Sequence, residues 1–229
     1  MIYKLLDKFL MNDFTEEIIN NLENKKKKLV IFDVGCFVGN FSRNIKKKLS
    51  KKKINFYLFD PNPNLNMPDF KYIKTALTSK SKYQNYYLND FFPSSGSSLN
   101  PIVKKDKIWN FTRKIASFNM GKDFKTYKVK TDTIDNFCRI KKIKYIDVLK
   151  IDVEGGEIDV LLGAKNILKK TNLIQLEVLD TKKNFNKKYQ KVINILNKYN
   201  FKVLNAKNIF SVGILSNIKS MDVLLKKDL

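Results

Sequence analysis

The chain has no histidine, only two cysteines and few arginines, and each scarcity excludes a class of site. A zinc site is not expected, because Cys36 and Cys138 alone cannot supply the usual ligands. Two cysteines also cannot build a disulfide framework. A general base must then be a carboxylate, a lysine, a tyrosine or a metal-bound water. If a metal takes part, only an all-oxygen site for Mg²⁺ or a similar hard cation is expected.

Arginine is scarce even though the chain carries a formal net charge of +23. Only Arg43, Arg113 and Arg139 are arginines among the 45 Lys and Arg residues, and the lysines are scattered along the sequence. Proteins that read bases or hold phosphates in a bidentate manner favour arginine. The composition therefore argues against a nucleic-acid partner, although the positive field would attract an anionic substrate.

Long apolar runs are also missing. No run approaches the roughly 18 residues that span a bilayer, and the first residues lack the pattern of a secretory signal. These two features predict a cytoplasmic protein without a transmembrane segment. The 229 residues, 43% of them hydrophobic, suffice for one well-buried α/β domain. We expect a helical lead-in over residues 1–28, followed by that domain over residues 29–229.

Strand-like and helix-like segments alternate along most of the chain, which favours a mostly parallel sheet with helices on both faces. Strands are expected at residues 29–34, 54–60, 71–77, 145–153, 173–178, 201–204 and 221–225, and helices from about residue 40 and over 156–169 and 184–199. One of the last two strands is expected to be antiparallel and to complete a seven-stranded sheet.

An insertion over about residues 79–135 interrupts this alternation. It holds further strands and a Ser-rich loop at residues 93–98, which we expect to lie over the ligand edge of the sheet. Trp109, Phe111 and Phe118 belong either to a substrate pocket or to the core.

The first expected strand ends in the loop Asp33-Val34-Gly35-Cys36-Phe37-Val38-Gly39, which leads into a helix. Gly35 and Gly39 let the backbone approach a ligand, and the start of the helix offers free N–H groups. The glycine spacing matches neither the dinucleotide-binding fingerprint nor the P-loop. Asp33 would repel a phosphate but suits a cationic ammonium or sulfonium group. A cofactor-binding corner and an ordinary turn are both consistent with this loop.

The second expected strand ends at Asp60, which is followed by Pro61. An acidic side chain at this point of a doubly wound sheet can accept hydrogen bonds from ribose hydroxyls. A plain Asp-Pro turn is the alternative.

The densest cluster of candidate catalytic groups is Lys150-Ile151-Asp152-Val153-Glu154-Gly155-Gly156-Glu157. Lys150, Asp152 and Glu154 alternate and so share one face of a strand that should otherwise be apolar. One explanation is structural: Lys150 pairs with Asp152, and Glu154 or Glu157 begins the next helix. The other places the carboxylates beside a ligand at the edge of the sheet. Asp152 and Glu154 are then the best-placed bases, with Glu177 on the next strand behind them.

Together these strings resemble the FkbM family of S-adenosylmethionine-dependent methyltransferases over roughly residues 29–180. The matching strings are Asp33-Val34-Gly35 with Gly39 and Ser42, Phe59-Asp60-Pro61-Asn62-Pro63, Ala76-Leu77, Ser97-Ser98-Leu99, Thr133-Ile134-Asp135 and, above all, residues 149–157 with Gly163. The resemblance implies a class I methyltransferase (Rossmann-like) α/β fold. It also implies transfer of a methyl group, usually to a hydroxyl of a sugar, polyketide or similar metabolite.

The resemblance further implies where the cofactor binds. The residues that it places there are Asp33, Gly35, Cys36, Phe37 and Gly39 at the methionine end, Asp60 and Pro61 at the ribose, and Ala76 and Leu77 near the adenine. Three features depart from the family pattern: Cys36-Phe37 replaces small or amide residues, Asp60 stands where Glu is commoner, and the helix after the second strand is cut to about residues 64–69.

We expect Asp152 or Glu154 to take or orient the proton of the acceptor hydroxyl, directly or through a metal ion such as Mg²⁺. Lys150 and Glu177 are further catalytic candidates. Two rival functions stay open. The net charge, with Asp152, Glu177 and nearby lysines, suggests an RNA 2′-O-methyltransferase, but a fitting second lysine and an aromatic stacking platform are not evident. The altered Cys36-Phe37 loop suggests a binding protein that keeps the fold without turnover.

Overall fold

The computed structural model describes residues 14–25, 27–89, 97–100, 124–209 and 217–228. Its centre is a seven-stranded sheet in the order β3-β2-β1-β7-β8-β10-β9. The strands are β1 (Leu29–Val34), β2 (Ile54–Phe59), β3 (Lys71–Ile73), β7 (Ile146–Ile151), β8 (Thr171–Thr181), β9 (Phe201–Ile209) and β10 (Ile218–Lys227).

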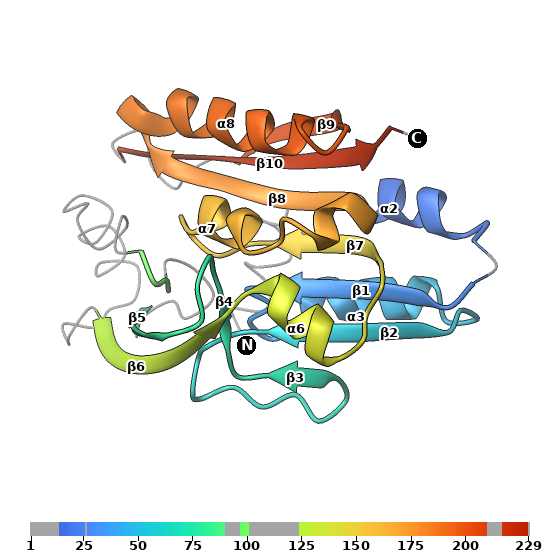
Figure 1. The fold of residues 1–229 in the computed structure, drawn as a ribbon, viewed down its shortest axis with the longest axis horizontal. Helices are drawn as coiled ribbons and strands as arrows, with labels where there is room; N and C mark the ends of the chain where they lie inside the picture. The colour runs from blue at the N-terminus through green and yellow to red at the C-terminus, as the bar shows by residue number, and fades with distance from the viewer. Residues whose placement is uncertain (1–13, 26, 90–96, 101–123, 210–216, 229) are drawn as a thin grey trace.

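Only β10 is reversed in this sheet: it pairs antiparallel with β8 and β9, while the other neighbours pair in parallel (Figure 1). The finding confirms the mostly parallel, seven-stranded sheet and the class I methyltransferase fold. Every residue of β1 and of β7 is buried, as expected for parallel strands that are covered on both faces.

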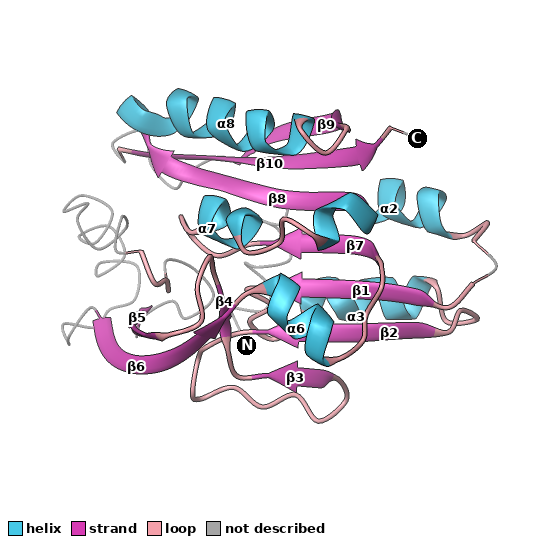
Figure 2. Cartoon of the chain, viewed as in Figure 1, coloured by secondary structure: helices cyan, strands magenta, loops and turns pink. Residues whose placement is uncertain are grey.

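Helices cover both faces of the sheet (Figure 2). On one face, α2 (Thr15–Leu22) and α3 (Asn40–Lys48) bury Ile18, Leu22 and Ile45 against the strands. On the other face, α6 (Ile134–Ile140), α7 (Glu157–Leu162) and α8 (Lys182–Asn197) bury Phe137 and Val160, among others. Two separate hydrophobic cores result, and they confirm the prediction of helices on both faces.

A second, three-stranded sheet has the order β4-β6-β5 and consists of β4 (Ala76–Leu77), β5 (Tyr83–Asn89) and β6 (Phe124–Asp132). The single strand expected over residues 71–77 is therefore wrong. Residues 71–73 pair with β2, whereas Ala76 and Leu77 pair with Thr131 and Asp132 of β6. The chain changes sheets between these two pairings.

Two helices also differ from expectation. The helix expected over residues 156–169 ends at Leu162 and is followed by a 3₁₀ helix, η1 (Ile167–Lys170). The break falls at Gly163, where a Cβ atom would lie 2.1 Å from the carbonyl oxygen of Thr78, so the chain passes too close to this residue, which directly follows β4, for a side chain. Helix α6 was not predicted, although the Thr133 hydroxyl caps it by accepting the N–H of Asn136.

Trp109, Phe111, Phe118, residues 1–13 of the lead-in and most of the Ser-rich loop lie outside the described residues. Within the described part, no helix has the length and apolar character needed to cross a membrane.

Candidate functional site

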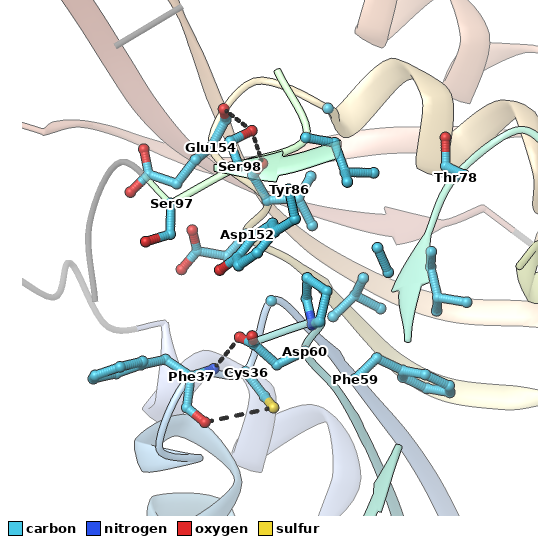
Figure 3. A pocket seen from close by; sticks show the side chains of 18 of the residues that line it. Cys36, Phe37, Phe59, Asp60, Thr78, Tyr86, Ser97, Ser98, Asp152 and Glu154 are labelled. Atoms are coloured by element: carbon cyan, nitrogen blue, oxygen red, sulfur yellow. Dashed lines mark hydrogen bonds between the residues drawn. The ribbon is translucent and has the colours of Figure 1, made fainter. Parts of the chain in front are cut away.

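A cavity of about 320 Å³ opens where β1, β2 and β7 end. Ligands of open α/β sheets bind at this edge, and the volume lies within the range of small-molecule pockets. Figure 3 shows the carboxyl groups of Asp60, Asp152 and Glu154 arranged around it. The expected site residues among its lining are Gly35, Cys36, Phe37, Asp60, Pro61, Ala76, Leu77, Lys150, Asp152 and Glu154.

The loop after β1 packs directly against the end of β7. Gly35 has a φ of 77°, and a Cβ atom there would lie 1.7 Å from the backbone oxygen of Asp152. Only glycine fits this approach. Gly39 also has a positive φ, of 74°, and precedes α3, but it is not among the residues that line the cavity. Gly35 therefore brings the ends of β1 and β7 together at the cavity.

Asp60 holds this loop from the end of β2. One carboxylate oxygen accepts the N–H of Phe37 and the other accepts the N–H of Asn62, both at 2.9 Å. Asp60 is only 6% exposed, and burial raises the pKa of its carboxyl to about 6. Each oxygen has a second lone pair, so Asp60 can also accept hydrogen bonds from a vicinal diol in the cavity. Burial likewise raises the pKa of the neighbouring Cys36 thiol.

Lys150 lies between two carboxylates. Its Nζ is 3.0 Å from Oδ2 of Asp152 and 3.6 Å from Oδ1 of Asp33. Burial by itself would lower the pKa of Lys150, but the charges of Asp152 and Asp33 outweigh this effect and raise it. Asp33 is fully buried, accepts a hydrogen bond from Ser42 at 2.8 Å and does not line the cavity. Asp33 thus serves as a buried counter-charge to Lys150, whereas Asp152 faces the cavity.

Glu177 approaches Asp152 from β8, away from the cavity. Burial raises the pKa of Glu177, and the carboxylates of Asp152 and Glu154 raise it further. Glu177 is not among the residues that line the cavity, and the structure thereby separates it from the other two candidate carboxylates, Asp152 and Glu154.

The wall opposite the sheet was predicted only in part: the Ser-rich loop was expected over this edge, but none of the residues of the wall was named as a site residue. β5 and residues 97–100 supply Gln84, Tyr86, Ser97, Ser98 and Asn100. Tyr86 is only 4% exposed, and burial raises the pKa of its hydroxyl. The Ser-rich loop and the string Ser97-Ser98-Leu99 indicated residues 97–99. Nothing indicated the residues of β5, which lies in the interrupted stretch, where periodicity predicts no site. Thr75, Thr78 and Asp159 are further lining residues that were not predicted.

The charges that line the cavity are mainly negative. Among the described lining residues there is one cation, Lys150, against four acidic side chains, those of Asp60, Asp152, Glu154 and Asp159. Such a cavity favours a cationic ligand over a phosphate. With a diol acceptor at Asp60 and the apolar side chains of Ala76 and Leu77, it fits the sulfonium, ribose and adenine of S-adenosylmethionine. No group of three or more His, Cys, Asp or Glu side chains in the described ranges is arranged to hold a metal ion, so the expected Mg²⁺ ligands find no support there.

Comparisons with known proteins agree with this chemistry. The model of the Methyltransferase FkbM domain matches residues 33–203. The 2-O-methyltransferase NoeI of Sinorhizobium fredii is 26% identical over 176 residues, which cover 72% of this chain and 68% of NoeI.

Solved structures with a similar fold include a methyltransferase FkbM from Methylobacillus flagellatus, with 10% identity, a TM-score of 0.46 and coverage of 96% of this chain and 57% of that one. Trm5b from Pyrococcus abyssi has 13% identity, a TM-score of 0.40 and coverage of 92% of this chain and 48% of that one. The chain thus spans about half the length of these two proteins.

Proposed function

This chain belongs to the FkbM family of S-adenosylmethionine-dependent methyltransferases, and we propose that it methylates a hydroxyl oxygen of a sugar or a similar small metabolite. The observation that carries the proposal is the position of Asp152. Its carboxylate lines the cavity while Lys150 Nζ, 3.0 Å away, holds it from the buried side.

The loop after β1 and the end of β2 are the proposed cofactor side. Gly35, Cys36 and Phe37 would lie along the methionine end, Asp60 would accept the ribose hydroxyls, and Ala76 and Leu77 would contact the adenine. When bound, S-adenosylmethionine supplies a methyl group that is activated by the sulfonium charge. The carboxylates around the cavity favour this cation and thereby help to hold it.

Asp152 is the proposed group that accepts or orients the proton of the acceptor hydroxyl. Its side chain is 36% exposed, so it can reach a ligand in the cavity. Holding acceptor and cofactor in line can supply about 7–11 kcal/mol of the barrier reduction, and a positioned base typically adds about 10²- to 10⁴-fold. Glu154 is the second candidate, because it also lines the cavity.

Two observations support a neutral hydroxyl acceptor. NoeI is a 2-O-methyltransferase, and the described lining is mainly acidic despite the formal net charge of +23. Carboxylates at the site disfavour a polyanion such as RNA.

The test is an incubation of the protein with methyl-labelled S-adenosylmethionine and either neutral mono- and oligosaccharides or RNA. We expect label on a sugar oxygen, release of S-adenosylhomocysteine and no label on RNA. Methylated nucleosides would instead support 2′-O-methylation of RNA. Cofactor binding without transfer to any acceptor would identify a binding protein and contradict the proposal.

A further inference from the structure

The loop that joins β7 to α7 contains two consecutive residues with positive φ angles. Glu154 has a φ of 53° and Gly155 a φ of 109°. Residues other than glycine seldom adopt the left-handed region, and they remain there only when their surroundings hold them. Val153, Glu154 and Gly156 of this loop line the cavity, so whatever holds the backbone also shapes the site.

A buried ion pair holds the loop from the side of α8. Lys188 donates hydrogen bonds to the carbonyl oxygens of Gly155, at 2.8 Å, and Leu179, at 2.7 Å, and its Nζ lies 2.6 Å from Oε2 of Glu157. The other oxygen of Glu157 accepts the N–H of Gly155 at 2.6 Å. Both polar backbone groups of Gly155 are thus bound by this pair.

Residues 97–100 hold the same loop from the opposite side. The Ser98 hydroxyl donates to the carbonyl oxygen of Glu154 at 2.9 Å (Figure 3), and the Asn100 amide donates to that of Gly155 at 3.3 Å. The loop therefore lies between α8 and the wall that faces the sheet. Its conformation depends on polar contacts on both sides.

Burying the Glu157–Lys188 ion pair costs desolvation free energy that apolar side chains would not cost. Glu157 is fully buried and Lys188 is 8% exposed, and two apolar side chains of similar volume often stabilise a protein as well as a buried ion pair or better. Apolar side chains, however, could not bind the N–H and the carbonyl of Gly155. Neither Glu157 nor Lys188 lines the cavity, so any effect on the reaction must pass through the loop.

We propose that Glu157 and Lys188 are positioning residues, which set the Glu154-Gly155 backbone and so orient Glu154 and the cavity wall beside Asp152 for the acceptor. This inference rests on the proposed methyl transfer. It assigns the two residues a role in turnover that goes beyond the stability of the fold.

The test compares Lys188→Met and Glu157→Met with the double variant. Each single change leaves one buried charge without its partner, so both should lower stability in urea unfolding. The double variant has no unpaired charge and should be more stable than either single variant. Gly155, however, still lacks both contacts from the pair in the double variant, and its carbonyl keeps only the Asn100 amide. Amide hydrogen exchange in residues 153–157 should therefore stay faster than in the wild type, and kcat should stay about 10- to 100-fold lower, with unchanged affinity for S-adenosylmethionine.

Asp147→Asn is the matched control. Asp147 is also fully buried, pairs with Lys25 at 3.0 Å and accepts a backbone N–H, that of Val30, but it lies at the opposite end of β7. This variant should lose stability while kcat and the exchange of residues 153–157 stay as in the wild type.

Two outcomes separate this inference from the proposed function. Recovery of kcat and of slow exchange in the double variant would show that the pair is only structural and would overturn the inference alone. Absence of methyl transfer by the wild type would overturn the proposed function and, with it, the catalytic part of the inference, whatever the exchange shows.

Discussion

The ammonium nitrogen of Lys150 lies 3.0 Å from a carboxylate oxygen of Asp152, two residues further along the chain. The sequence suggested two alternatives for these residues, a structural ion pair or a ligand site. The structure shows the ion pair and also places Asp152 at the cavity. Lys150 is buried against Asp33 as well, whereas Asp152 extends into the cavity. The ion pair thus connects the interior of the sheet to the proposed acceptor site.

Lys150→Met should destabilise the fold by about 3–5 kcal/mol, because it leaves the fully buried Asp33 without a counter-charge. Urea unfolding measures this loss. The double variant Lys150→Met/Asp33→Asn should regain part of it, since no uncompensated charge then remains beside β1. If the double variant is less stable than Lys150→Met, the proposed pairing is not what stabilises this region.

Asp60→Asn should weaken S-adenosylmethionine binding by about 1.5–3 kcal/mol, the usual contribution of a hydrogen bond to a charged group. The amide keeps the shape of the side chain but loses the charge and half of its acceptor capacity. Isothermal titration calorimetry gives the affinity. Asp228→Asn, an exposed residue paired with Lys202, is the control and should bind as the wild type does. Equal affinities for all three proteins would argue against a ribose at Asp60.

Asp60 should also make stability depend on pH. Burial raises its pKa to about 6, from about 3.9 in an unfolded chain. Between these values the folded protein binds more protons, so this group's contribution is present at low pH and is lost as the pH rises. Relative to Asp60→Asn, the wild type should lose about 3 kcal/mol between about pH 4 and about pH 7. A difference that stays constant across urea unfolding at these pH values would contradict the burial of Asp60.

Gly35→Ala should destabilise the protein by about 3 kcal/mol or more, because it adds a clash to an unfavourable backbone conformation. The new Cβ atom would lie 1.7 Å from the Asp152 backbone oxygen, at a φ of 77°. Gly156→Ala is the comparison in the same cavity: its Cβ would meet only ordinary contacts, the nearest at 3.4 Å. Thermal or urea unfolding of both variants separates the two cases, and equal losses would mean that Gly35 is not specially required.

The strands of the large sheet were largely predictable, because the apolar pattern that indicates each strand lies within the strand's own residues. Leu29–Phe32 is a continuous apolar run, and β1 (Leu29–Val34) has the expected bounds. The expected strand over residues 71–77 was wrong because its two ends pair with different partners, and the partner of Ala76, Thr131, lies far along the chain. Periodicity in a short window carries no information about such a pairing.

The site was predictable to a similar extent. Gly35, Asp60 and Asp152 each directly follow a parallel strand, and the topology brings them to one cavity. Whether an acidic side chain faces that cavity depends on its tertiary partners. Asp33, for example, accepts a hydrogen bond from Ser42 and pairs with Lys150 in the interior. Tyr86 belongs to the second sheet, whose place over the cavity follows from long-range pairing between β5 and β6.

The most direct test of the central claim is the rate of methyl transfer by Asp152→Asn at saturating S-adenosylmethionine, measured with the acceptor that the wild type methylates. The substitution keeps the size of the side chain and removes its ability to take a proton. The rate should fall about 10²- to 10⁴-fold, while the affinity for the cofactor stays close to that of the wild type. A variant that binds the cofactor poorly but transfers methyl groups at the normal rate once saturated would contradict the account.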